Sequence, residues 1–239
     1  MLLEAFHLLV SLHHYTTVHL LTVNYAGATD RYLTVMRDMG FRYFTVWNLI
    51  MQCVYFSACT GEHALRAVTG NDLPLLRRWQ KLRESLFQAL VFPTGLVVFS
   101  LFWTIYSYDR SLVYPAIVDE YVAPHVNHFM HTDVAVVVVL EMLLRPHHYH
   151  RRGMHLGLLF LYCFSYLTCY LYTYWTRGIW IYPLYYHLSW TQQILMNVVT
   201  TFIVPGVCYL LGEAIASALW GETLSCHARV VSNGNNVVN

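Results

Sequence analysis

The stretch HVNHFMHTDVAVVVVLEMLL, from His125 to Leu144, joins three histidines at a spacing of three to a long β-branched apolar run. An apolar run of this length is typical of a helix that crosses a lipid bilayer. On a helix, His125, His128 and His131 drift slowly around one face, so His131 enters the bilayer on the same side as the other two. We therefore expect a membrane-spanning helix with imidazoles at its entrance.

The composition of the whole chain indicates the same class of protein. Of its 239 residues, 57% are hydrophobic and 11% are charged, and the mean hydropathy is +0.42. A soluble domain has about 25% charged residues. The formal net charge of +1, with Lys and Arg scattered in short loops, gives no sign of nucleic-acid binding. We expect an all-α, multi-pass membrane protein whose partners are the membrane and its lipids.

Six apolar segments are long enough to cross a bilayer as helices, which takes about twenty residues each. They are Leu3 to Val23, Tyr43 to Thr60, Leu86 to Tyr108, Val126 to Leu144, Leu156 to Trp175 and Ile194 to Leu219. We expect a single transmembrane domain over residues 1–239, a bundle of about six helices with a short tail at 220–239. The first segment is expected to be retained, because no Lys or Arg precedes it. Pro205 and Gly206 should kink the last one.

The distribution of Lys and Arg predicts the orientation. Nine of these residues lie on the side that holds both termini and the loops at 61–85 and 145–155, and five lie on the other side. Short cytoplasmic loops carry the excess of positive charge. Both termini are therefore predicted to be cytosolic. We expect the protein in the membrane of the endoplasmic reticulum or in the plasma membrane.

Aromatic residues gather on the side opposite the predicted termini. They are Tyr106, Tyr108, Tyr114, Trp175, Trp180, Tyr182, Tyr185, Tyr186 and Trp190. Tyr and Trp are enriched where a bilayer meets water, so an interfacial belt is one interpretation. A roof over a lipid-binding cavity is the other.

Neither the cysteines nor the histidine-rich phrases predict a metal site. The six cysteines lie almost entirely inside the apolar segments and include no C-x-x-C pair, which is typical of packing residues. The phrases around His131 and His147 superficially resemble the histidine boxes of membrane di-iron enzymes, but these two residues are roughly 24 Å apart along one helix. They cannot share a metal centre. We expect no metal or organic cofactor, with haem ligation by histidines of the first and fourth segments as an open alternative.

Three ionisable residues, His131, Asp133 and Glu141, lie inside the predicted fourth helix. Such residues are costly in lipid and by default indicate a functional site, although polar contacts between helices are the simpler interpretation. The second apolar segment starts on the same side as the fourth, so Thr45 and His131 are expected at similar depth. A neutral imidazole within about 3 Å of a Thr hydroxyl can take its proton as the oxygen attacks an ester carbonyl.

Further residues are candidates to support this pair. Asn48, one turn below Thr45, is a candidate oxyanion donor or orienting residue, and His128 is a candidate to hold the ring of His131. Asn127 belongs to the same group of supporting or oxyanion candidates. Spacing alone favours the pairing only weakly, because a Thr at the start of a helix is more often its N-cap.

Five phrases occur in order over about residues 41–215. They are Phe92-Pro93-x-Gly95, Phe102-Trp103-x-Ile105-Tyr106-x-Tyr108-Asp109-Arg110-x-x-x-Tyr114-Pro115, Asn127-His128-x-Met130-His131-Thr132, Gly178-x-Trp180-x-Tyr182-Pro183 and Tyr209-Leu210-Leu211-Gly212-Glu213. Together they resemble the androgen-induced-gene and androgen-dependent TFPI-regulating protein family. The resemblance implies a six-helix membrane hydrolase with a threonine nucleophile and a histidine, acting on fatty acid esters of hydroxy fatty acids.

Carried over residue by residue, the resemblance assigns the nucleophile to Thr45 and the histidine to His131. One departure is Asn48, where vertebrate members are expected to have Asp, so no role that needs a carboxylate is carried over to it. Others are the extra His125 and the loop from Gly61 to Ser85, which shows no clear match. Two other classes stay open, a non-enzymatic lipid-binding or regulatory scaffold and a haem- or metal-binding redox protein.

Overall fold

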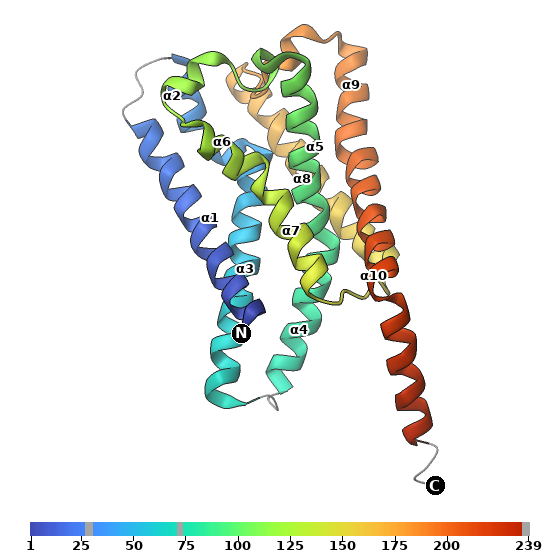
Figure 1. The fold of residues 1–239 in the computed structure, drawn as a ribbon. Helices are drawn as coiled ribbons and strands as arrows, with labels where there is room; N and C mark the ends of the chain where they lie inside the picture. The colour runs from blue at the N-terminus through green and yellow to red at the C-terminus, as the bar shows by residue number, and fades with distance from the viewer. Residues whose placement is uncertain (27–30, 71–73, 236–239) are drawn as a thin grey trace.

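The computed structural model describes residues 1–26, 31–70 and 74–235, and over these residues it is all-α, without strands. Six rods of helix run roughly along one direction (Figure 1). They are α1 (Leu2–Ala26), α3 (Phe44–Thr69), α4 (Pro74–Leu86) with α5 (Phe92–Asp109), α6 (Pro124–His131) with α7 (Asp133–Leu144), α8 (Arg152–Arg177), and α9 (Trp190–Val198) with α10 (Val204–Asn235). A short helix, α2 (Arg31–Asp38), and 3-10 turns at Gly40–Arg42, Arg110–Leu112, Ala116–Glu120 and Pro183–His187 connect them.

Three of the rods are long and apolar enough to cross a membrane. They cover Pro74–Leu112, Arg152–Arg177 and Trp190–Gly221, and α6 with α7 makes a fourth if the bent pair is one span. The first and second predicted spans correspond to α1 and α3. These two helices are not among the rods that are apolar enough, because polar residues such as His7, Asn48 and Gln52 interrupt them. These side chains are buried between helices instead.

The outer faces of α8 and α10 carry apolar side chains that no other part of the described chain covers. Leu161, Phe164 and Val207 are each more than half exposed, and similar residues continue along both helices. A contiguous apolar surface of this kind marks contact with a membrane or a partner. It supports the conclusion from composition that the protein lies in a membrane.

The stretch from His125 to Leu144 is not the single straight helix that the sequence predicts. It bends by 44° at Thr132, between α6 and α7. The Thr132 hydroxyl is 3.0 Å from Nδ1 of His128 and accepts a hydrogen bond from Nε1 of Trp103 at 3.1 Å. These two contacts hold Thr132 at the bend. The bend brings the end of α6, which carries His131, close to α3 and α5.

Two π-helical turns accompany the prolines of the third and sixth rods. One covers Phe87–Val91, just before Pro93, and the other covers Val199–Ile203, just before Pro205. Proline has no N–H to donate to the carbonyl four residues earlier, and that carbonyl lies inside the π turn in both cases. The distortion expected at Pro205 is thus absorbed as a π turn, and the rod continues through it.

Helices α5 and α7 approach closely at Gly95. A Cβ atom on Gly95 would lie 2.9 Å from the carbonyl oxygen of Val134 and 3.1 Å from Nε2 of Gln52. Only a residue without a side chain allows this approach, as in many membrane helix interfaces. The contact fixes α7, and through the bend α6, against α5.

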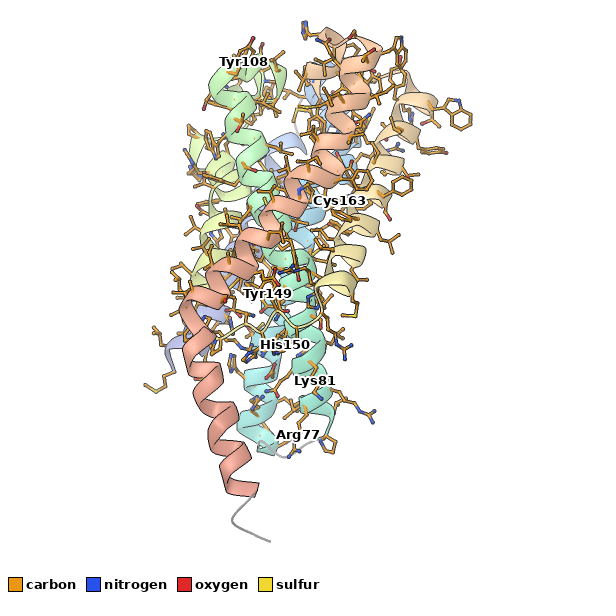
Figure 2. All side chains as sticks on the ribbon, turned by 90° about the vertical axis from the view of Figure 1, so that its right-hand side faces the viewer. Arg77, Lys81, Tyr108, Tyr149, His150 and Cys163 are labelled. Atoms are coloured by element: carbon orange, nitrogen blue, oxygen red, sulfur yellow. The ribbon has the colours of Figure 1, made fainter. Side chains whose placement is uncertain are left out.

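The two ends of the bundle differ. Figure 2 shows Tyr108 at one end and Arg77 and Lys81 at the other, where α3 meets α4 and α10 projects beyond the bundle. The predicted tail, residues 220–239, is mostly helical, since α10 continues to Asn235, and residues 236–239 lie outside the described part.

Candidate active site

Thr45 and His131 meet at the end of the bundle that carries Tyr108. Thr45 lies in the first turn of α3 and His131 is the last residue of α6, and their Oγ1 and Nε2 atoms are 3.4 Å apart. This distance is long for a hydrogen bond, but catalytic contacts are often long before substrate binds. Thr45 is not the N-cap of α3, because that position belongs to Tyr43.

Asn127 fixes the ring of His131. The Nδ1 atom of His131 lies 2.8 Å from Oδ1 of Asn127 and 3.1 Å from its backbone oxygen. Both partners are acceptors, so Nδ1 carries the hydrogen, and Nε2 turns a lone pair toward Thr45. The Phe102 ring stacks on the imidazole with centroids 3.5 Å apart. The ring is buried and held in the tautomer that a general base requires.

The contacts found for His128 go to Thr132 and Trp103, and it is Asn127 that contacts the ring nitrogen of His131. Nδ1 of His128 contacts the Thr132 hydroxyl, and its ring stacks against Trp103 at 5.2 Å. Residues three and four positions earlier both lie on the face of His131, and here the oxygen of Asn127 is the group that reaches Nδ1. His128 therefore helps to hold the bend at Thr132.

Asn48 does not face the Thr45–His131 pair either. Its side chain is fully buried, its Nδ2 donates to Oγ1 of Thr94 at 2.8 Å, and its Oδ1 accepts from Nε2 of Gln52 at 3.1 Å. Gln52 also donates to the backbone oxygen of Val134. The amide of Asn48 is thus used in joining α3 to α5 and α7, and it is not placed to receive an oxyanion.

A cavity of about 400 Å³ opens beside the pair. Thr45 and His131 lie in its wall, and most of the remaining lining is apolar. Lining residues from α3, α5 and α8 include Leu49, Val98, Phe102, Cys163, Tyr166 and Leu167. A mostly apolar cavity with a few polar groups is the usual form of a small-molecule site. Its lining suits an apolar ligand that presents a polar group to Thr45.

The aromatic residues at this end divide between the two roles that the sequence left open. Tyr114, Tyr182 and Tyr185 line the cavity, and the first and third are buried. Trp175 and Trp190 point away from the protein, with 80% and 70% of their surfaces exposed. The first group covers the cavity, and the second has the exposure of an interfacial belt.

One backbone donor lies next to the hydroxyl of Thr45. The first N–H groups of a helix have no partner within the helix. In α3, the N–H of Phe44 donates to the hydroxyl of Tyr182 at 3.3 Å, and those of Val46 and Trp47 donate to the oxygen of Tyr43. Among the described residues, the N–H of Thr45 has no such acceptor. It can serve an oxyanion that forms beside its own hydroxyl.

The comparisons with known proteins identify the family. The family model described as FAR-17a/AIG1-like protein matches residues 5–217. The chain belongs to the FAR-17a/AIG1-like family. It is 35% identical over 200 residues to androgen-dependent TFPI-regulating protein of Mesocricetus auratus, which covers 83% of this chain and 85% of that protein. It is 30% identical over 186 residues to androgen-induced gene 1 protein of Homo sapiens, covering 76% and 78%. No solved structure matches.

The family resemblance read from the five phrases is therefore confirmed. In this FAR-17a/AIG1-like protein, several of those phrases form the site itself: Phe102 stacks on His131, Trp103 holds Thr132, and Tyr182 lines the cavity. Sequence reasoning missed the stacking role of Phe102, and the only signal for it was its place in a family phrase.

Asp109 and Arg110 do not pair with each other in this FAR-17a/AIG1-like protein. Asp109 caps the following turn by accepting from the N–H of Ser111 at 2.9 Å. Arg110 binds Asp119 at 2.7 Å and donates to the backbone oxygen of Tyr114 at 3.2 Å. Arg110 thus braces the loop that carries Tyr114 over the cavity.

Proposed function

We propose that this chain is a membrane hydrolase that cleaves lipid esters, with Thr45 as nucleophile and His131 as general base and acid. The observation that carries the proposal is the 3.4 Å approach of Oγ1 of Thr45 to Nε2 of His131 at the wall of an apolar cavity. Polar contact between helices alone does not require a ring fixed in the basic tautomer beside such a cavity.

The reaction has two halves. Nε2 of His131 takes the hydroxyl proton of Thr45 as Oγ1 attacks the ester carbonyl carbon. The backbone N–H of Thr45, at the positive end of α3, donates to the developing oxyanion. Collapse of the intermediate breaks the ester bond, and His131 gives the proton to the departing alcohol. Water then attacks the acyl-threonine with the same base, and Thr45 recovers its proton as the fatty acid leaves.

Asn127 orients the base without adding a negative charge. A carboxylate in its place would stabilise the imidazolium that forms during the reaction. An amide fixes the tautomer only, so the pair is expected to be a slow catalyst. No metal or organic cofactor takes part in this mechanism.

Fatty acid esters of hydroxy fatty acids are the substrate class that we propose, from the family resemblance and the apolar lining. Such a substrate has two long chains that meet at an ester. The cavity beside Thr45 suits one chain, and the exposed apolar faces of the bundle allow the other to remain in lipid. The partners are then the lipid ester and the bilayer, and the protein is multi-pass, in the endoplasmic reticulum or plasma membrane, with both termini cytosolic.

Covalent labelling tests this function without knowledge of the preferred ester. Detergent-solubilised protein is treated with a long-chain alkyl phosphonate probe, digested, and mapped by mass spectrometry. We expect the adduct on the peptide that contains Thr45, with labelling reduced by competing lipid ester. Absence of any adduct, with intact lipid binding, would instead favour the non-enzymatic lipid-binding scaffold.

A further inference from the structure

A second buried polar cluster lies toward the other end of the bundle. His7 of α1, Cys59 of α3 and Glu141 of α7 offer ligand atoms that all lie within 4.8 Å of one another. All three side chains are fully buried. Glu141 follows His131 by ten residues, which corresponds to about three helical turns or roughly 15 Å along α6 and α7. The cluster is therefore separate from the Thr45–His131 site.

The carboxylate of Glu141 is oriented from two sides. Its Oε2 atom lies 2.8 Å from Nε2 of His7, and its Oε1 atom accepts a hydrogen bond from the Tyr55 hydroxyl at 2.9 Å. The other ring nitrogen of His7, Nδ1, lies 2.8 Å from Nε2 of His63. A histidine that binds a metal through one nitrogen usually donates its other N–H to such a neighbour.

His147 completes the cluster from the loop after α7. Its side chain is buried and stacked on Phe87, with centroids 4.0 Å apart. Among the described residues, neither of its ring nitrogens has a partner at normal hydrogen-bond distance; its nearest polar neighbours are the backbone of Glu141 and Oε1 of the same residue, 4.0 Å from Nε2. A buried imidazole without partners is costly. Nε2 of His147 lies on the side of Oε1 of Glu141, the oxygen that also accepts from Tyr55.

A hydrogen-bonded pair of His7 and Glu141 explains only half of this arrangement. It accounts for the 2.8 Å contact but leaves the two nitrogens of His147 without a partner. A divalent cation uses the lone pairs of both histidines together with the thiolate and the carboxylate. The charges also balance, because one divalent cation with one thiolate and one carboxylate is neutral, as a buried site requires.

We propose that this cluster binds a zinc ion through Nε2 of His7, Sγ of Cys59 and a carboxylate oxygen of Glu141, with His147, whose Nε2 lies 4.0 Å from Oε1 of that carboxylate, as the fourth ligand. A set of nitrogen, sulfur and oxygen ligands suits Zn²⁺, whereas Mg²⁺ and Ca²⁺ prefer oxygen alone. Binding releases the Cys59 thiol proton, together with any second proton held between His7 and Glu141. The site departs from the expectation that the cysteines only pack and that no metal is bound.

The proposed ion has a structural role. Four protein ligands leave no open position for substrate, which is the pattern of structural zinc sites. The ligands come from α1, α3, α7 and the following loop, so the ion joins α1 to the helices that carry Thr45 and His131. Ligand atoms around tetrahedral zinc lie about 3.2–3.8 Å apart. An ion would therefore separate His7 from Oε2 of Glu141, now 2.8 Å away, and draw in His147, whose Nε2 is 4.0 Å from Oε1.

Metal analysis of the full-length protein tests the proposal. Protein purified in detergent is loaded with zinc, desalted, and assayed for metal per chain, and the zinc shell is examined by X-ray absorption. We expect about one zinc per chain and a shell of one sulfur with three nitrogen or oxygen atoms. The absorption measurement needs only wild-type protein, so it decides the matter even if the variants fail to fold.

Two matched cysteine variants sharpen the test. Cys59→Ser removes the proposed sulfur ligand, and Cys53→Ser changes another buried cysteine of the same helix. With cobalt in place of zinc, we expect a sulfur-to-cobalt charge-transfer band in wild type and Cys53→Ser and its loss in Cys59→Ser. Zinc content below about a tenth of an ion per chain in wild type, or a zinc shell without sulfur, overturns the proposal.

Discussion

Oδ1 of Asn127 lies 2.8 Å from Nδ1 of His131, and the same ring turns Nε2 toward Oγ1 of Thr45 at 3.4 Å. The amide of Asn127, on the preceding turn of α6, thus helps to fix which nitrogen is basic. The backbone oxygen of Asn127, at 3.1 Å, is a second acceptor for the same hydrogen. The side chain and the backbone share the task of fixing the tautomer.

Asn127→Ala should therefore slow ester hydrolysis moderately. The variant loses one acceptor worth about 1 kcal/mol, roughly a fivefold to tenfold effect on rate, while the backbone oxygen still accepts from Nδ1. We expect kcat to fall with little change in KM, since Asn127 does not line the cavity. Steady-state kinetics on a fatty acid ester of a hydroxy fatty acid measure both. A loss as large as that of His131→Ala would mean that the backbone acceptor contributes nothing.

The two histidines of α6 should differ sharply when replaced. His131→Ala removes the base and should lower the rate by about 10² to 10⁴, the usual contribution of general acid–base catalysis. His128→Ala removes only the contact to Thr132 and the stack on Trp103, so most activity should remain. Hydrolysis rates at matched expression compare them. Equal losses accompanied by poor expression would indicate that both residues only hold helices together.

Some of this site follows from sequence rules, and the rest depends on contacts between helices. Alternation of spans predicts that Thr45 and His131 begin at the same membrane face, and the structure brings them together. Asn127 and His128 are both candidates from the sequence, and the contact from Asn127 to Nδ1 of His131 distinguishes them. The roles of Asn48 and Phe102 could not be predicted from spacing within one helix. Asn48 contacts Thr94 and Phe102 contacts His131, and in each case the partner lies on another rod.

The helix break and the second cluster were equally hard to foresee. Thr132 has no sequence feature that ends a helix, and its bend depends on Trp103, which lies 29 residues earlier. Glu141 stood out as an ionisable residue in an apolar run. Its partners His7 and Tyr55 come from α1 and α3, however, and no local pattern places them beside it. Sequence periodicity predicts which face of a helix is buried, but it does not predict which other helix packs against that face.

Cysteine accessibility should establish the proposed orientation. Arg77 and Tyr108 lie at opposite ends of the bundle (Figure 2), and Tyr108 is 86% exposed. In intact cells or sealed vesicles, Arg77→Cys should react with an impermeant maleimide only from the cytosolic side, and Tyr108→Cys only from the other. The prediction rests on the excess of Lys and Arg at the Arg77 end. Reversed labelling would move the Thr45 site to the cytosolic leaflet.

Thr45 itself gives the most decisive test, because its two candidate roles predict different results. As a helix cap its loss would cost about 1 kcal/mol of stability and little activity, but the cap of α3 is Tyr43. As a nucleophile, Thr45→Ala should abolish both hydrolysis and phosphonate labelling. Thr45→Ser keeps the hydroxyl but frees its χ1 rotation, so labelling and turnover should fall without vanishing. Both are measured on detergent-solubilised protein at matched expression, with Thr94→Ala as a control that removes a buried hydroxyl outside the cavity lining. Undiminished labelling of the Thr45→Ala variant would leave the proposed hydrolase without its nucleophile.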